Sequence, residues 1–295
     1  MEIKDVVIIG AGPAGIAAAI QLKRYRIEHV LLEKDEMGGL LRNANLVENY
    51  PGFPEGIHGL ELVELFKRQA ENTGVVTCIE RVEEVDLLNN IFEIRTDRRT
   101  IRSTYVVIAS GTNPKRLPSP PLPREIESRI YYEIYPILGL ENKKIAIIGA
   151  SDAAFDYALS LSQKNHVLIL NRSSHSRCIP VLRERCMNSQ EISYMRKIRI
   201  QEIKDGEGRV LLNCHHESKK KPFTIVSDYL VIAIGREPAL DFLKSGLKRN
   251  YRKLFNSNRL FLIGDVKNEM YRQTAICVGD GIKTAMRIYH KMGRA

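Results

Sequence analysis

Three glycines near the start of the chain have the spacing of a nucleotide-binding turn. Gly10, Gly12 and Gly15 follow the apolar run 6–9, and an alanine-rich stretch begins at Pro13. Gly10 permits a tight turn, Gly12 lets the backbone approach a pyrophosphate, and Gly15 lets a helix pack closely on a strand. The start of that helix would present free N–H groups to phosphates. We therefore predict a dinucleotide-binding turn.

An acidic residue completes this first unit. Glu33 ends the next apolar run, where a carboxylate accepts hydrogen bonds from the ribose hydroxyls of a bound nucleotide. Strand, glycine turn, helix and acid thus follow one another in the order of a complete dinucleotide-binding unit.

A second turn of the same kind begins at Gly149, but Ser151 stands where the middle glycine is expected. Its Cβ and Oγ would crowd a pyrophosphate, or its hydroxyl would itself donate to a phosphate. No carboxylate stands where selection of NADH would favour one. Two interpretations stay open: a site for NAD(P)H, or a retained fold with a weak or empty site. The candidate contacts at this turn are Gly149, Ser151, Asp152 and Ala153.

The cysteines are few and scattered. They stand at positions 78, 178, 186, 214 and 277, and no two form a C-x-x-C pair. Their odd number and spacing argue against a disulfide framework and a zinc site. His215 and His216 have no third ligand nearby, so we expect no metal. Cys277 falls near the start of the last helix, where a thiol pKa can be lowered, but we expect it to be a packing residue.

Composition narrows the class of protein. The chain has 295 residues, of which 44% are hydrophobic, and its longest apolar runs fall short of the ~18 residues of a membrane span. With no signal-peptide pattern at the start, we expect a cytoplasmic protein. The net charge of +10 indicates either attraction to an acidic partner or a solvated basic surface. Nucleic acid is not expected, because the basic residues are spread out and no binding motif is present.

The elements that must position these residues alternate along the chain. The first unit is predicted as a strand at 5–10, a helix at 13–25 and a strand at 29–34, and the second as a strand at 143–149, a helix at 151–163 and a strand at 166–174. Antiparallel strands are expected at 209–218 and 223–235. The pattern predicts an α/β fold with two Rossmann-like dinucleotide-binding domains.

The order of the segments predicts that one domain is inserted in the other. The proline-rich stretch 112–126 is typical of an exposed crossover, and a second crossover is expected after 231–240. We therefore expect one domain from 1–116 and 241–295, and the other from 117–240.

Several segments are similar to the flavin-site motifs of low-molecular-weight thioredoxin reductases. They are Gly38-Gly39-Leu40-Leu41, Val47–Pro54, Ile57–Leu62, Val107–Gly111, Gly264-Asp265-Val266, Tyr271-Arg272-Gln273 and Gly279-Asp280-Gly281. The resemblance extends from about residue 5 to 290, nearly the whole chain. It implies that the domain of 1–116 and 241–295 binds FAD, that the domain of 117–240 is NAD(P)-binding-like, and that the protein is a homodimer. In that family three basic groups hold the 2′-phosphate of NADP. Arg172 and Arg177 match two of them and Ser173 replaces the third, so the resemblance favours NADPH over NADH at the second site.

The resemblance also assigns roles at the FAD site. Asp265 would hold the ribitol chain, and the backbone of Gln273 and Thr274 would face the flavin edge that becomes negative on reduction. Asn49 would lie near the flavin ring, or else serve only as a turn residue. The implied FAD contacts are Gly10, Gly12, Pro13, Ala14, Gly15, Glu33, Lys34, Gly39, Leu40, Asn49, Val82, Ala109, Gly111, Gly264, Asp265, Arg272, Gln273 and Thr274.

The chain departs from that family at the redox dithiol. Tyr132 and Tyr135 stand where the family has its two cysteines, and Pro136 stands where it has an acid. Disulfide exchange needs a thiolate, so the usual route of thioredoxin reduction is not expected. The tyrosines would stack on the flavin or fill the vacated space. The chain is in this respect similar to thioredoxin-reductase-like ferredoxin–NADP reductases.

We therefore expect an oxidoreductase that passes electrons from NAD(P)H through FAD to an external acceptor such as ferredoxin, flavodoxin or a quinone. Two alternatives stay open. One is an FAD enzyme with a donor other than nicotinamide, such as reduced ferredoxin. The other is a non-catalytic FAD-binding scaffold or sensor. The sequence names neither a catalytic residue nor the acceptor.

Overall fold

The computed structural model describes residues 3–218, 221–248 and 259–293. Positions 1–2, 249–258 and 294–295 of the first expected domain, and 219–220 of the second, lie outside the described residues. The chain divides into two compact units. The first contains Met1–Arg42, Val47–Asn113 and Glu237–Ala295, and the second contains Asn43–Leu46 and Pro114–Arg236.

The first unit is built on a seven-stranded sheet. Its strands are β1 (Ile3–Ile9), β2 (His29–Glu33), β5 (Thr77–Ile79), β6 (Val82–Leu88), β7 (Ile91–Thr96), β8 (Thr100–Ile108) and β19 (Leu260–Leu262). The order is β5-β2-β1-β8-β7-β6, and β19 pairs with β8. The apolar run in β1 is buried on both faces, which is the pattern of a parallel strand covered on two sides.

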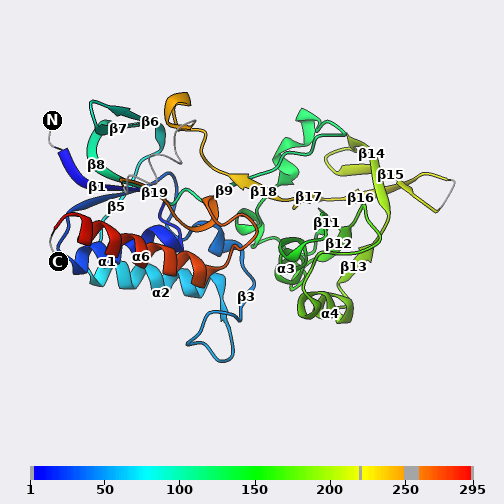
Figure 1. Ribbon diagram of the computed structural model, residues 1–295. Coiled ribbons are helices and arrows are strands. Elements are labelled where there is room, and N and C mark those ends of the chain that lie inside the picture. Colours follow the sequence, from blue (N-terminus) through cyan, green and yellow to red (C-terminus); the bar gives the residue numbers. More distant parts are fainter. Residues whose placement is uncertain (1–2, 219–220, 249–258, 294–295) are drawn as a thin grey trace. The chain divides into compact units, whose positions relative to one another are not determined.

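Among its described residues, the first unit has three longer helices, and two of them pack closely. They are α1 (Pro13–Arg24), α2 (Gly59–Asn72) and α6 (Thr274–Lys291). Figure 1 shows α1 and α6 side by side. A Cβ at Gly281 would lie 2.3 Å from the Ala14 carbonyl oxygen, so the glycine lets the two backbones approach. Shorter elements are η1 (Gly39–Asn43), β3 (Leu46–Val47), β4 (Ile57–His58) and η4 (Gly264–Val266).

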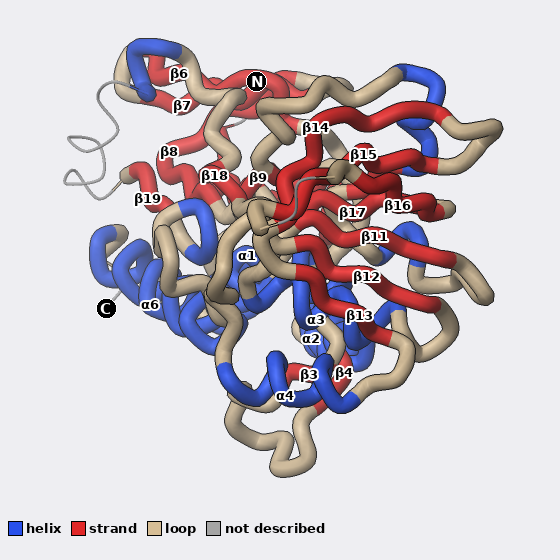
Figure 2. Tube along the Cα trace, turned by 90° about the vertical axis from the view of Figure 1, so that its right-hand side faces the viewer, coloured by secondary structure: helices blue, strands red, loops and turns tan. Residues whose placement is uncertain are grey.

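The second unit has a five-stranded parallel sheet in the order β10-β17-β11-β12-β13 (Figure 2). Its strands are β10 (Ile130–Tyr131), β11 (Lys144–Ile148), β12 (His166–Leu170), β13 (Ile192–Met195) and β17 (Tyr229–Ile232). Its helical elements are η2 (Arg124–Arg129), η3 (Tyr135–Ile137), α3 (Asp152–Leu161) and α4 (Pro180–Asn188). Phe155 of α3 is fully buried against the sheet core.

An antiparallel sheet accompanies it, formed by β14 (Ile198–Asp205), β15 (Val210–His216) and β16 (Phe223–Ser227). The predicted strand 223–235 is therefore wrong as a single element, because it divides at Asp228. There the Asp228 carboxylate accepts from the Lys144 N–H at 2.8 Å and the Asp228 N–H donates to the Lys144 carbonyl oxygen at 2.7 Å. These bonds direct the chain from β16 into the parallel sheet as β17.

The two crossover segments pair with each other through β9 (Thr112–Pro114) and β18 (Arg236–Pro238). The proline-rich crossover is only partly exposed, since Pro120 and Ile126 are buried. Within the part of the chain that the structure describes, no helix has both the length and the apolar composition to cross a membrane.

Candidate functional site

The first glycine turn is shaped by contacts within the chain itself. Gly10 has a φ of +104°, and a Cβ there would lie 2.4 Å from the Ala109 carbonyl oxygen. A Cβ at Gly15 would lie 1.9 Å from the Gly10 carbonyl oxygen. The Gly10 N–H donates to the Leu32 carbonyl oxygen at 2.7 Å, which ties the turn to β2. Backbone geometry and packing therefore require both glycines.

Gly12 is different, because nothing in the chain requires it to be glycine. Its φ of −76° and ψ of −177° are open to any residue, and a Cβ there would meet no protein atom within 4 Å. It caps α1 without a side-chain hydrogen bond, and Pro13 is the first helical residue. A Cβ at Gly39 would lie 3.3 Å from the Gly12 Cα, so Gly39 borders the same space. The missing side chain leaves room for a phosphate at the helix start.

Glu33 is held in place by the backbone. Its side chain is buried, and Oε2 accepts from the Ala11 N–H at 2.8 Å. Oε1 accepts from the N–H groups of Lys34 at 2.9 Å and Asp35 at 3.2 Å. A carboxylate has about four acceptor positions, so one stays available to a ribose hydroxyl. The Lys34 side chain is exposed, so the contribution of Lys34 to this site is its backbone N–H, which donates to Glu33.

The structure brings together two residues that the sequence separates widely. Asn49 Nδ2 donates to Gln273 Oε1 at 2.9 Å, across 224 residues of chain. Gln273 is the N-cap of α6, and Thr274 is its first helical residue. Asn49 thus lies at the start of α6.

Asp280 shapes the neighbouring loop, a role that sequence reasoning missed. Its carboxylate accepts from the Gly264 N–H at 3.1 Å and from Asn268 Nδ2 at 2.7 Å, and forms an ion pair with Lys267 at 3.3 Å. Gly264 has a φ of +70°, which glycine adopts readily. In the sequence, the motif Gly279-Asp280-Gly281 was the feature that could have indicated this role of Asp280. These bonds fix the backbone that presents Asp265.

Cys277 is a packing residue rather than a reactive thiol. It is 6% exposed, and its Sγ donates to Asp265 Oδ1 at 3.2 Å. Burial raises the pKa of the Cys277 thiol, and the adjacent Asp265 raises this pKa further. These effects outweigh any lowering of its pKa by the helix N-terminus. The thiol therefore stays protonated at neutral pH.

Arg272 has an atom that lacks a protein partner. Within the described residues, its buried Nε forms no hydrogen bond. A buried donor without an acceptor costs roughly 1–3 kcal/mol, and more when it is charged. A ligand that supplies an acceptor, such as a flavin nucleotide, would remove this cost. Together with the room beside Gly12, this atom shows that the residues present fit the expected FAD.

The other expected FAD contacts come from several elements, and two of them, Ala109 and Gly111, follow the carboxyl end of β8. Ala109 follows β8 and is buried, and Gly111 accepts from the Ala239 N–H at 3.1 Å. Val82 begins β6, shortly after Glu80, whose N–H donates to the Glu33 carbonyl oxygen at 2.8 Å. Ala14 lies in α1 and the half-buried Leu40 in η1. Ligands of open α/β sheets bind at this edge.

The second glycine turn keeps the shape of the first. Gly149 has a φ of +148°, and a Cβ there would lie 2.3 Å from the Ala233 carbonyl oxygen. Ser151 caps α3 without a side-chain hydrogen bond, and its backbone pairs with Arg177. Asp152 is engaged, since its Oδ1 accepts from the Ile179 N–H at 2.8 Å. Ala153, on α3, is exposed.

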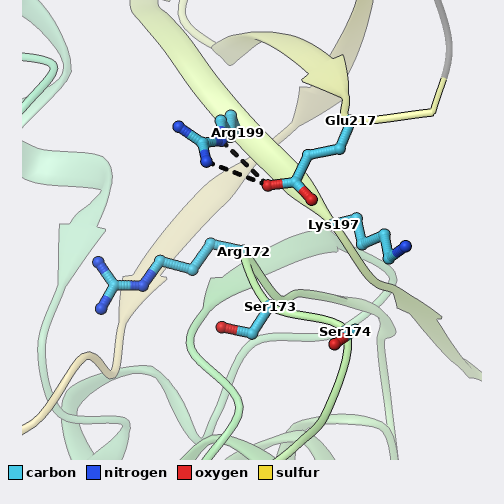
Figure 3. A pocket seen from close by; sticks show the side chains of 6 residues that line it. All are labelled: Arg172, Ser173, Ser174, Lys197, Arg199 and Glu217. Atoms are coloured by element: carbon cyan, nitrogen blue, oxygen red, sulfur yellow. Dashed lines mark hydrogen bonds and ion pairs between the residues drawn. The ribbon is translucent and has the colours of Figure 1, made fainter.

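A pocket opens at the end of β12. Figure 3 shows its lining: Arg172, Ser173, Ser174, Lys197, Arg199 and Glu217. Arg177, which the sequence groups with Arg172, is not among the lining residues. The sequence analysis did not predict Lys197 and Arg199 at this pocket, because they come after β13 and lie outside the loop that follows β12. The run of basic residues at 196–199 was the available signal.

The segment that replaces the dithiol is firmly held within the second unit. The N–H groups of Ile134 and Tyr135 donate to Asn43 Oδ1 at 2.9 and 2.8 Å. The Arg116 guanidinium lies 4.6 Å from the centre of the Tyr132 ring. The buried Tyr132 hydroxyl has no hydrogen-bond partner among the described residues.

Asp156, on α3, is a half-buried carboxyl group. It accepts from the Asn45 N–H at 3.0 Å. Burial raises its pKa to about 6, more than the Asn45 hydrogen bond lowers it. This group therefore titrates near neutral pH.

Known proteins resemble the chain over nearly its whole length. A family model described as pyridine nucleotide-disulphide oxidoreductase matches residues 4–281. Thioredoxin reductase 2 of Arabidopsis thaliana is 31% identical, covering 97% of this chain and 81% of the relative. Thioredoxin reductase 1 of Saccharomyces cerevisiae is 29% identical over 95% of each chain. The crystal structure of Lactococcus lactis thioredoxin reductase matches with a TM-score of 0.88 and 26% identity, over 99% of this chain and 100% of that one. The predicted α/β fold with two Rossmann-like domains is confirmed.

Proposed function

Because the chain belongs to the pyridine nucleotide-disulphide oxidoreductase family, we propose that it is an FAD-dependent oxidoreductase that takes electrons from NAD(P)H and delivers them to an external acceptor without a redox dithiol. The family binds FAD and NAD(P)H. The assignment of the first unit to FAD and of the second to NAD(P)H is part of this proposal.

The observation on which the FAD assignment rests is the room beside Gly12. The backbone allows any residue at this position, so the glycine is explained by a ligand that approaches the start of α1. Glu33, with one acceptor position left, suits the ribose of the same ligand. The buried Nε of Arg272 is a hydrogen-bond donor without an acceptor among the described residues, and the same ligand would supply one.

Bound FAD would supply hydride acceptance and electron transfer. The chain's own residues would bind and orient it. The first N–H groups of α6 stabilise negative charge, and the hydrogen bond between Asn49 and Gln273 fixes the side chains at that helix start. Asp265 is positioned by the loop that Asp280 holds and by the thiol of Cys277.

The absence of a C-x-x-C pair from the sequence supports an external acceptor. Tyrosine at positions 132 and 135 cannot undergo thiol–disulfide exchange. The remaining routes from reduced flavin lead to a docked electron-transfer protein or to a small molecule such as a quinone. The net charge of +10 suits an acidic ferredoxin or flavodoxin. Homodimerisation is proposed from the family resemblance.

One observation favours a second candidate, in which reduced ferredoxin or another donor replaces nicotinamide. Ser151 adds a side chain where a pyrophosphate would approach α3. An anaerobic titration of the purified protein with NADPH, NADH and reduced ferredoxin distinguishes these donors. Rapid bleaching of the flavin by NADPH or NADH is the expected result. Bleaching by ferredoxin alone would establish the second candidate, and bleaching by none would indicate a scaffold or sensor.

A thioredoxin assay tests the acceptor. Thioredoxin with a disulfide reporter should give no turnover, whereas an artificial dye should be reduced. Thioredoxin turnover as fast as dye reduction would contradict the proposed route.

A further inference from the structure

The segment that replaces the dithiol, Tyr132–Tyr135, is anchored in the core of the second unit. It runs from the end of β10 into η3. Ile134 is fully buried in the apolar cluster that contains Ile145 of β11, whereas Tyr132 packs against the cluster that contains Ala146, the next residue of the same strand. Because successive residues of a strand point to opposite faces, the segment contacts the clusters on both faces of the parallel sheet.

The described chain passes between the two units through three connections. One is the short excursion Asn43–Leu46, which belongs to the second unit although the residues on both sides of it belong to the first. The other two are the crossovers, which enter the second unit at Pro114 and leave it at Arg236. Relative movement of two units joined by such connections is the default expectation, unless contacts at the boundaries oppose it.

The excursion is bound to the segment through the side chain of its first residue. Asn43 is 3% exposed, and its Oδ1 accepts from the N–H groups of both Ile134 and Tyr135, at 2.9 and 2.8 Å. The Asn45 N–H adds a bond to Asp156 Oδ2 on α3 at 3.0 Å. One side-chain oxygen therefore holds two consecutive backbone donors. Leaving such donors unpaired inside a protein is costly, so the excursion does not detach readily.

Both crossovers bind the first two residues of the same segment. The Arg116 guanidinium lies 4.6 Å from the centre of the Tyr132 ring, two residues after the first crossover enters the second unit. Arg236, the last residue before the second crossover leaves, forms an ion pair with Glu133 at 2.8 Å, and its side chain is 17% exposed. A partly buried ion pair is screened less than an exposed one, so salt weakens this contact little.

We propose that Tyr132–Tyr135 is a joint at which the second unit holds all three connections, and that these contacts restrain the movement of one unit relative to the other. Each of the four residues contributes one group: a ring, a carboxylate and two backbone N–H groups. Because the segment is itself fixed in the core, a connection bound to it cannot swing without breaking a contact. The proposal concerns the chain alone and needs neither the nucleotides nor the acceptor of the proposed function.

The distance between two spin labels, one in each unit, tests this proposal in the purified full-length protein. The labels are attached to Arg68→Cys on α2 and to Gln190→Cys after α4, because both positions are exposed. Cys78 and Cys178 are replaced by serine, since these two native thiols are not fully buried. With the joint intact, we expect one narrow distribution of distances.

Two substitutions at the joint should broaden that distribution. Asn43→Ala removes the acceptor of two N–H groups and should widen it about twofold. Glu133→Gln breaks the ion pair with Arg236 and should widen it by a smaller amount, because the other contacts remain. The two substitutions together should widen it more than either alone.

Two variants with matched chemistry act as controls. Asn213→Ala removes a side chain that accepts from the Thr224 hydroxyl and donates to Glu202, both at 2.9 Å, on the antiparallel sheet of the same unit. Glu141→Gln breaks an ion pair with Lys164 at 2.5 Å. Neither contact involves a connection between the units, so both variants should keep the narrow distribution. Melting temperatures report whether each variant is folded.

The outcomes separate this proposal from the proposed function. A distribution that is already broad with the joint intact overturns the proposal. So does an unchanged distribution in both Asn43→Ala and Glu133→Gln, or equal widening by the two controls. If Asn43→Ala does not fold, the partly exposed Glu133→Gln decides the outcome by itself. Failure of NADPH to reduce the flavin would contradict the proposed function and leave the joint in place.

Discussion

The two glycine turns of this chain have the same backbone design. In each, the first glycine donates to the end of the second strand, at 2.7 Å for Gly10 and 3.1 Å for Gly149. In each, a carbonyl oxygen would lie within 2.4 Å of any Cβ added there. The residues that cap the following helices, Gly12 and Ser151, have nearly the same extended backbone.

The difference lies where the chain faces a ligand. Gly12 leaves room for a ligand at the start of α1, whereas Ser151 places a side chain at the start of α3, although the backbone at both positions would accept any residue. Glu33 has a carboxylate with an acceptor position left for a ligand. Asn171 at the same place is neutral, and its side chain forms hydrogen bonds with the backbone of its own loop. Residues that hold the turn together are therefore retained in both units. Residues that would touch a nucleotide are the ones that differ, which indicates two sites with different ligands.

The largest expected effect is at Gly12. Gly12→Val places a branched side chain in the space left for a pyrophosphate, so the purified variant should fall from about one FAD per chain to nearly none. The measurement is the flavin absorbance of released cofactor per protein. Gly139→Val is the matched control, because a Cβ at Gly139 also meets no atom within 4 Å and its backbone is not left-handed. Full flavin in Gly12→Val would refute the assignment of this turn.

The counterpart at Ser151 should show a smaller and opposite effect. Ser151→Gly should tighten NADPH binding threefold to tenfold, about 1 kcal/mol, by removing the crowding side chain. Ser151→Ala separates the two interpretations of the serine. If the hydroxyl donates to a phosphate, alanine weakens binding, whereas if the Cβ crowds the phosphate, only glycine relieves it. Equilibrium titration of each variant with NADPH measures the dissociation constant and decides between the two interpretations.

A third difference between the two helices concerns pH. The residue of α3 that corresponds to Ala17 of α1 is Asp156, whose pKa burial raises to about 6. Its folded pKa lies above its unfolded value of 3.8, so its contribution to stability is fully present below pH 4 and is lost as the pH rises through 6. Asp156→Asn, which keeps the acceptor for Asn45, should therefore be more stable than wild type at pH 7.5 by about 1–2 kcal/mol.

Urea unfolding at pH 4 and pH 7.5 measures this change. The gain in unfolding free energy should be confined to the higher pH. A gain of the same size at both values would mean that packing, not ionisation, is responsible.

The smallest effect is expected from the cysteines. Replacing all five by alanine or serine should preserve most dye-reductase turnover, with stability losses of about 1 kcal/mol per buried site. Burial raises the pKa of Cys178 and Cys186 to about 12 and of Cys214 to about 11, so these thiols stay protonated at neutral pH. A variant that folds with full FAD yet loses turnover would place a thiol in the electron path, and restoring Cys277 alone would test whether it is that thiol.

The fold was largely predictable because its signals are local. The apolar run before Gly10, the glycine spacing and the acid at Glu33 lie within one strand–helix–strand unit. The second unit repeats the order of strand, turn, helix and strand, with Ser151 and Asn171 in place of Gly12 and Glu33. The predicted strand over 223–235 was wrong because an apolar run does not show which sheet will take its two halves. The backbone bonds between Asp228 and Lys144 decide that.

For the site, the sequence by itself determined the residues whose roles follow from the backbone, such as the turn at Gly10 and the carboxylate of Glu33. Only the tertiary structure decided which distant residues meet there. Asn49 reaches Gln273 across 224 residues, and Lys197 reaches Ser173 through a strained turn. Sequence spacing fixes neighbours along a strand or helix, whereas these partners depend on how several elements pack.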